Sequence, residues 1–229
     1  MTFKKCLIGL CGMLAMTSAN AAIITQFGSN VKFTYDDSTL FGTGTVVGNS
    51  IFFTPDNFIA ESLNGAGSTL TTDLIDIVIE STTSGYTMEK YVLAESGDYI
   101  SDGTGASVSA DAFLQVNSNT TICGLFFPCM AQEIYSAGSL SDTGGGLAFW
   151  NLGGAIDLAD TAGWGSDTSV TVTLQNTLQA ETLNTGETAF IQKKNGAIGI
   201  QVVPVPAAVW LFASGLLGLV GVARRNTDI

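Results

Sequence analysis

The chain has 229 residues, of which 46% are hydrophobic and 12% charged, and its formal net charge is −12. This composition excludes an intrinsically disordered chain, because the apolar content is ample for a core. There is no histidine, which excludes the usual serine triad, the common zinc sites and a histidine general base.

The amino end has the features of a secretory signal. Lys4 and Lys5 precede an apolar run over residues 6–16, and the small-residue triplet Ala19-Asn20-Ala21 follows. A charged start, a short apolar segment and an A-x-A site form the pattern that signal peptidase cuts. We therefore expect residues 1–21 to be a signal peptide and the mature chain to begin at Ala22. The alternative, a helix of the hydrophobic core, explains neither the lysines nor the triplet.

Residues 22–201 are predicted to form one exported all-β domain. Apolar and polar residues alternate over 75–80, 108–116 and 170–175, and a period of two buries one face of a strand. Many short strands separated by turns predict an antiparallel β-sandwich, of which a jelly-roll-like topology is one form. Residues 56–63 are compatible with one short helical turn.

The charge of this domain is strongly negative. Between Ala22 and Val203 there are four lysines and 19 acids, a net charge of about −15. Such a surface repels a phosphate backbone, so no nucleic-acid partner is expected.

Two pairs of asparagine and glycine predict tight hairpins. Gly48-Asn49 separates residues 45–47 from 50–53, and Asn195-Gly196 separates residues 190–194 from 197–200. Asparagine and glycine accept the positive φ that two-residue hairpin turns require.

Cys123 and Cys129 are the cysteines that remain after removal of the signal. An even pair in an oxidising compartment predicts a disulfide. The alternative is two free thiols in an apolar loop.

Three aspartates and two tryptophans are candidate ligand-binding residues. Asp157, Asp160 and Asp167 lie in one stretch and offer oxygen ligands for calcium, although their spacing is not that of an EF-hand. Solvated loop acids are the simpler interpretation. Trp150 and Trp164 lie in Gly-rich stretches, where they could stack on sugar rings or pack under a loop. No residue set indicates catalysis, so no enzyme activity, metal or obligatory cofactor is expected.

The carboxyl end is predicted to be a membrane anchor. Residues 207–223 form an uncharged stretch that is just long enough for a transmembrane helix. Arg224 and Arg225 follow at once, and basic residues stay on the cytoplasmic side. Residues 224–229 would thus be a basic cytoplasmic tail, residues 202–206 a linker, and the domain would lie outside.

This tail resembles the PEP-CTERM sorting signal. The resemblance rests on Pro204 and Pro206, on the helix with its Trp210-Leu211-Phe212 start, and on the basic stop at Arg224 and Arg225. Val205 stands between the prolines where the family's motif has glutamate. The resemblance implies processing by an exosortase near residues 204–206, a Gram-negative host, and a product associated with exopolysaccharide or biofilm.

The sequence thus predicts an exported envelope or extracellular protein with a structural or interaction role in the matrix. Its precursor would be anchored in the inner membrane, and its mature domain would be periplasmic, on the cell surface or extracellular. The expected partners are signal peptidase, exosortase and extracellular polysaccharide. The alternative hypothesis is a carbohydrate-binding module, assisted by calcium.

Overall fold

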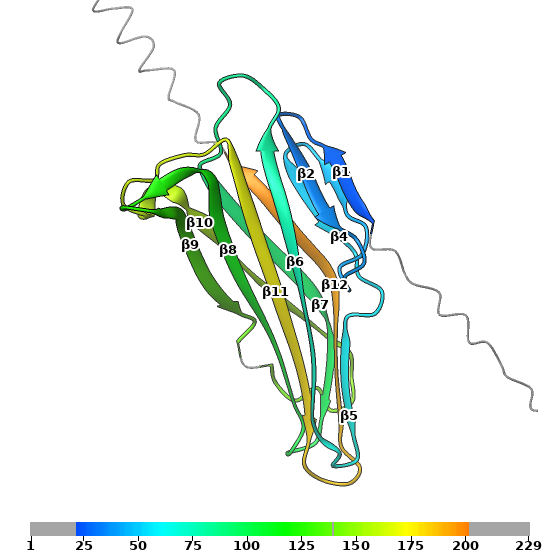
Figure 1. Cartoon of the computed structure of the whole chain (residues 1–229). Helices are drawn as coiled ribbons and strands as arrows, with labels where there is room; N and C mark the ends of the chain where they lie inside the picture. The colour runs from blue at the N-terminus through cyan, green and yellow to red at the C-terminus, as the bar shows by residue number, and fades with distance from the viewer. Residues whose placement is uncertain (1–21, 139, 202–229) are drawn as a thin grey trace, which may run out of the picture.

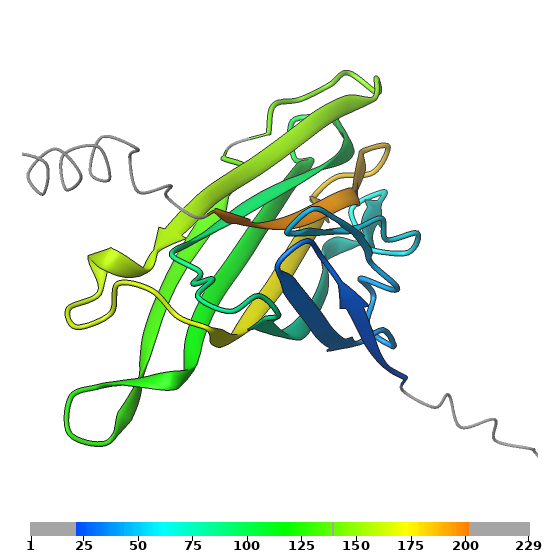
Figure 2. The same ribbon diagram turned by 90° about the horizontal axis from the view of Figure 1, so that it is seen from above.

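The computed structural model of the protein describes residues 22–138 and 140–201. Figure 1 shows two layers of long antiparallel strands, and Figure 2 shows the same layers from above. Within the described residues the one helix is a single 3-10 turn, Leu158–Asp160. The all-β, antiparallel β-sandwich predicted from the sequence is therefore confirmed.

The first sheet has six strands. In spatial order they are β1 (Ile23–Phe27), β2 (Val31–Asp36), β6 (Gly67–Ser81), β11 (Ser169–Thr182), β8 (Ser107–Cys123) and β9 (Phe127–Ser136).

The second sheet also has six strands and packs against the first. Its order is β10 (Ala148–Asp157), β7 (Lys90–Asp102), β12 (Thr188–Gln201), β4 (Ser50–Phe53) and β3 (Thr45–Val47), and β5 (Ile59–Leu63) also pairs with β12.

The predicted alternation is the reason that these segments form two-faced strands. Along β8 the even-numbered residues from Val108 to Val116 are buried, and β11 shows the same alternation from Val170. On β6 the buried positions are Ile75, Ile77 and Ile79. These side chains meet those of the other sheet in one apolar core.

One predicted hairpin is confirmed and the other is wrong. β3 and β4 are joined through Gly48, whose φ is +62°. Asn195-Gly196, by contrast, lies within the continuous strand β12, where the register against β7 shifts between Lys193 and Asn195. The pair makes a bulge because β12 has partners along both edges, and this pairing outweighs the local turn preference.

The helical turn proposed for residues 56–63 is also wrong. Residues 59–63 form β5, which pairs with β12 from Ile59↔Gln192 to Leu63↔Thr188. Periodicity alone cannot distinguish a helix from a strand in a short apolar segment. Here the segment is a strand because it pairs with the edge of β12.

Candidate functional site

An exposed apolar hairpin tip is the most distinctive surface of the described protein. β8 and β9 meet in a turn at Gly124, whose φ is +86°. Ile122, Leu125, Phe126 and Phe127 surround that turn and are 65%, 87%, 84% and 74% exposed. These four residues are called the apex below. The hairpin projects from the sandwich in Figure 2, where it is the green loop.

The apex is uncharged within a strongly acidic domain. Residues 112–132 contain no Asp, Glu, Lys or Arg. The exposed apolar surface continues along β9 through Met130 and Ile134. Contiguous exposed apolar surface of this kind usually marks a site of interaction with a protein, a membrane or a ligand.

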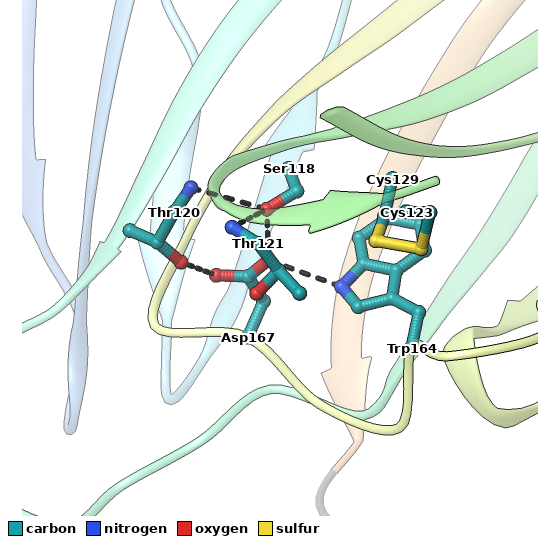
Figure 3. Close-up of a disulfide and its surroundings, with 7 residues drawn as sticks. All are labelled: Ser118, Thr120, Thr121, Cys123, Cys129, Trp164 and Asp167. Carbon is teal, nitrogen blue, oxygen red and sulfur yellow. Dashed lines mark hydrogen bonds between the residues drawn. A yellow bond between two sulfur atoms is a disulfide. The ribbon is translucent and has the colours of Figure 1, made fainter. Parts of the chain in front are cut away.

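A disulfide closes the neck of the hairpin. Cys123 and Cys129 are joined with an S–S distance of 1.99 Å and a Cα–Cα distance of 4.7 Å (Figure 3). The predicted disulfide is confirmed. It ties the end of β8 to β9 and so limits the conformations open to the apex.

Below the disulfide, β8 departs from regular pairing and wraps around a buried carboxylate. The register between β8 and β9 shifts between Asn117 and Ile122. Ser118 Oγ and Thr120 Oγ1 both donate to Asp167. Ser118 Oγ in turn accepts from the backbone N–H of Thr121 at 2.6 Å and of Thr120 at 3.1 Å (Figure 3).

The same carboxylate organises the loop before β11. It accepts hydrogen bonds from Trp164 Nε1 at 3.0 Å and from the backbone N–H groups of Thr168 at 2.7 Å and Ser169 at 3.1 Å. Burial by itself would raise the pKa of Asp167, but the hydrogen bonds from Ser118, Thr120 and Ser169 lower the pKa below its ordinary value. Asp167 is therefore an ionised anchor for the base of the hairpin.

Of the two interpretations offered for the tryptophans, sugar stacking or packing inside the protein, the structure shows both side chains packed inside. Trp150 and Trp164 are each only 2% exposed. Trp150 Nε1 donates to the carbonyl of Gln192 at 3.1 Å, and Trp164 Nε1 donates to Asp167. Both rings pack in the core, as expected for large apolar side chains whose one polar atom finds a partner, so neither presents a face to a sugar.

The three candidate calcium ligands are not brought together. Asp167 is buried and its oxygens accept from protein donors. Asp157 caps the 3-10 turn by accepting from the N–H of Ala159 at 3.0 Å, and Asp160 is exposed within that turn. No cluster of three or more potential metal ligands occurs among the described residues.

Asp157 and Asp160 do line a shallow pocket. It has a volume of about 200 Å³ and lies between β9 and β10, where it is also lined by Gln132, Glu133 and Thr161. Two aspartates and a glutamate are thus among the residues that line one pocket.

The exposed apex was not predicted from the sequence. The run Leu125-Phe126-Phe127 was visible between the cysteines, but it was interpreted only through the disulfide. The signal in the sequence was a glycine and three large apolar residues within a short segment bounded by two cysteines. A disulfide between those cysteines keeps the segment short, so its apolar side chains cannot reach the core.

The terminal signals lie outside the described residues. These are Ala19 and Ala21 of the cleavage site, the motif Pro204-Val205-Pro206 and the stop at Arg224 and Arg225; Ala22, on the other side of the cleavage site, is the first described residue. Among residues 22–138 and 140–201 the structure contains no helix long and apolar enough to cross a membrane.

Comparisons with known proteins show no family for this chain. No protein-family model matches it, and no curated protein matches it. Among the solved structures similar to this chain are two of infectious bursal disease virus, each 11% identical. The structure of the Gt strain has a TM-score of 0.25 over 81% of this chain, and that of the Gx strain has a TM-score of 0.26 over 88%. The chain spans about half the length of these viral chains, 46% and 54%. At such TM-scores the likeness assigns neither a family nor a function.

Proposed function

We propose that this is an exported envelope or extracellular protein, anchored by its C-terminal tail and processed by an exosortase, whose domain has a structural or interaction role in an exopolysaccharide matrix. The signal peptide, the transmembrane helix and the sorting motif at residues 204–206 belong to this proposal, as does the jelly-roll-like topology.

The observation that carries the interaction role is the apex. A domain of about −15 charge is soluble through repulsion between its copies. It nevertheless holds Leu125, Phe126 and Phe127 in solvent on a disulfide-closed hairpin. Apolar side chains exposed to water are unfavourable in free energy. Burying them against a partner would be favourable, and because the hairpin already holds them in place, little entropy would be lost on binding.

The position of the apex relative to the tail supports the same proposal. Asp167, at the base of the hairpin, forms a bridge with Met88, and Lys90 pairs with Gln201, the last described residue. The chain thus leaves the sandwich toward residues 202–206 at the end that carries the hairpin. The disulfide is consistent with an oxidising compartment.

The alternative is a carbohydrate-binding module in which Phe126 and Phe127, rather than the tryptophans, stack on sugar rings. Their exposure favours this second candidate. Calcium assistance would then involve Asp157 and Asp160 at the acidic pocket rather than the buried Asp167.

A paired substitution separates the two. Leu125→Ser combined with Phe126→Ser removes apolar surface from the apex. Leu147→Ser combined with Phe149→Ser is the matched control, because these residues are also exposed, at 57% and 77%, but lie near the start of β10. The readouts are retention of the protein in isolated matrix and binding to a glycan array.

We expect the apex variant to be lost from the matrix at least tenfold, with unchanged folding, and the control variant to be retained. Glycan binding that disappears with Phe126→Ser alone would favour the carbohydrate-binding module. Equal retention of all variants would refute a role for the apex.

A further inference from the structure

A lysine, a glutamate and an asparagine lie buried together between the two sheets. Lys193 on β12 is 0% exposed, Glu95 on β7 is 3% exposed and Asn176 on β11 is 1% exposed. β7 and β12 belong to one sheet and β11 to the other, so the cluster bridges the core. Figure 1 shows β11 in the layer in front and β7 and β12 in the layer behind it.

Glu95 contacts both of the other side chains. Its Oε1 accepts from Lys193 Nζ at 2.6 Å, and its Oε2 accepts from Asn176 Nδ2 at 2.6 Å. Lys193 Nζ also donates to Asn176 Oδ1. The amine therefore lies beside the side-chain amide of Asn176, and one carboxyl group is in contact with both the amine and the amide nitrogen.

The surroundings of this cluster are apolar and closely fitted. Lys193 Nζ lies 4.6 Å from the ring centre of Phe41 and 5.8 Å from that of Phe58. A Cβ atom at Gly196 would lie 2.9 Å from Lys193 Cε and 3.0 Å from Nζ. The glycine in the bulge of β12 thus provides the space in which the lysine side chain turns toward Asn176.

Burial favours the neutral form of the Lys193 amine, which is the nucleophilic form. Loss of water lowers the pKa of the Lys193 ammonium, and the charge of Glu95 offsets this only in part. Transfer of one proton from Nζ to the Glu95 carboxylate removes two charges from the core. It leaves a neutral amine, the form that attacks a carbonyl carbon.

We propose that Lys193 and Asn176 are joined by an intramolecular isopeptide bond, formed within the folded protein with Glu95 as the proton-transferring group. Nζ of Lys193 attacks Cγ of Asn176, the N–C bond forms, and the bond from Cγ to Nδ2 breaks. Of the three protons of the ammonium, one goes to Glu95, one passes through the carboxyl group to Nδ2, and one stays on the new amide. Nδ2 leaves as ammonia, and no oxidant, reductant or other reactant is needed.

The bond would act as a covalent tie across the sandwich. It would connect β11 of the first sheet to β12 of the second, and β12 is the last strand before the predicted linker and anchor. It would also replace a buried ion pair by a neutral amide, which removes the desolvation cost of two charges. The inference rests on the cluster alone and is independent of the proposed function.

The test is the mass of the full-length protein purified from its host envelope in detergent, measured after reduction. The isopeptide predicts a mass lower by about 17 Da, one ammonia, than the processed sequence requires. Digestion and tandem mass spectrometry should recover a branched peptide that joins Lys193 to Asn176. Glu95→Gln, Lys193→Met and Asn176→Ala should each have the full mass that its own processed sequence requires and yield no branched peptide.

Two controls make the result specific. Lys194→Met alters the neighbouring lysine, whose ammonium is exposed and paired with Asp98, and should keep the link. Asn195→Ser removes an Asn-Gly step that can itself lose ammonia by closing to a succinimide, and should also keep the link. A wild-type protein of full mass, or one that lacks ammonia but gives no branched peptide, overturns the proposal without recourse to any variant.

Discussion

Trp164 Nε1 donates a hydrogen bond to Oδ2 of Asp167, three residues later in the chain, at 3.0 Å inside the protein. This contact joins the loop before β11 to the hydroxyl groups of β8, so one carboxylate holds the base of the exposed hairpin.

Asp167→Ala should therefore destabilise the protein strongly. The substitution leaves the buried Ser118 hydroxyl and the buried Trp164 indole without their acceptor, and buried donors without partners cost about 2–4 kcal/mol in total. Asp160→Ala, at an exposed position in the nearby 3-10 turn, should change the free energy of unfolding by less than about 0.5 kcal/mol. Urea denaturation measures both, and equal effects would contradict the anchoring role of Asp167.

Removal of the disulfide by Cys123→Ser with Cys129→Ser should loosen the apex more than the sandwich. The chain-entropy model gives about 2 kcal/mol for so short a loop. Chymotrypsin should then cut after Leu125 and Phe126 at least tenfold faster, while the strands remain protected. Unchanged cleavage would mean that the turn at Gly124 holds the apex without the disulfide.

Glu187 should give the protein a stability that is lost in acid. Hydrogen bonds from the Asn184 side chain, and from the N–H groups of Asn184, Gly105 and Leu183, lower its pKa from 4.5 to about 2. Because the folded-state pKa is depressed, this stabilisation is complete above pH 4.5 and disappears as the pH falls toward about 2. Melting temperatures from pH 2 to 6 should show a smaller acid-dependent decrease for Glu187→Gln than for wild type. Equal acid-dependent decreases in wild type and Glu187→Gln would contradict this role of Glu187.

Gly196→Ala should displace the Lys193 side chain. The added methyl group meets Cε and Nζ at 3.0 Å or less, and such overpacking in a core costs about 1–3 kcal/mol. The yield of the branched peptide should decrease in parallel. Gly165→Ala is the matched control, since a Cβ at that position meets no atom within 4 Å. Equal stability and equal link yield in the two variants would show that the bulge has room for a side chain.

The sequence predicted those parts of the fold that depend on local patterns. The alternation in β6, β8 and β11 identified buried faces because each strand has one face on the core. The β3–β4 hairpin followed from Gly48-Asn49, since no other strand competes for that turn. The Asn195-Gly196 hairpin failed because β7, β4 and β5 pair along β12, and such non-local pairing cannot be read from the turn residues.

The site was less accessible to sequence reasoning. Cys123 and Cys129 were paired correctly because two cysteines allow one pairing. Trp150 is buried on one face of β10, whereas Trp164 and Asp167 are buried in the segment before β11, and no periodicity indicates that a loop is buried. Glu95 lies 98 residues from Lys193 and 81 residues from Asn176 along the chain. Only the assembled sheets bring these three side chains together.

We propose that the domain is exported, anchored by its tail and released or transferred by an exosortase. The most direct test is the intact mass and cell fraction of the native protein in the host with and without its exosortase. We expect loss of residues 1–21 and of the tail near Pro206 in the wild-type host, and an intact tail in the inner membrane when the enzyme is deleted. A tail that stays intact in both strains would contradict the sorting function and remove the support for a matrix role.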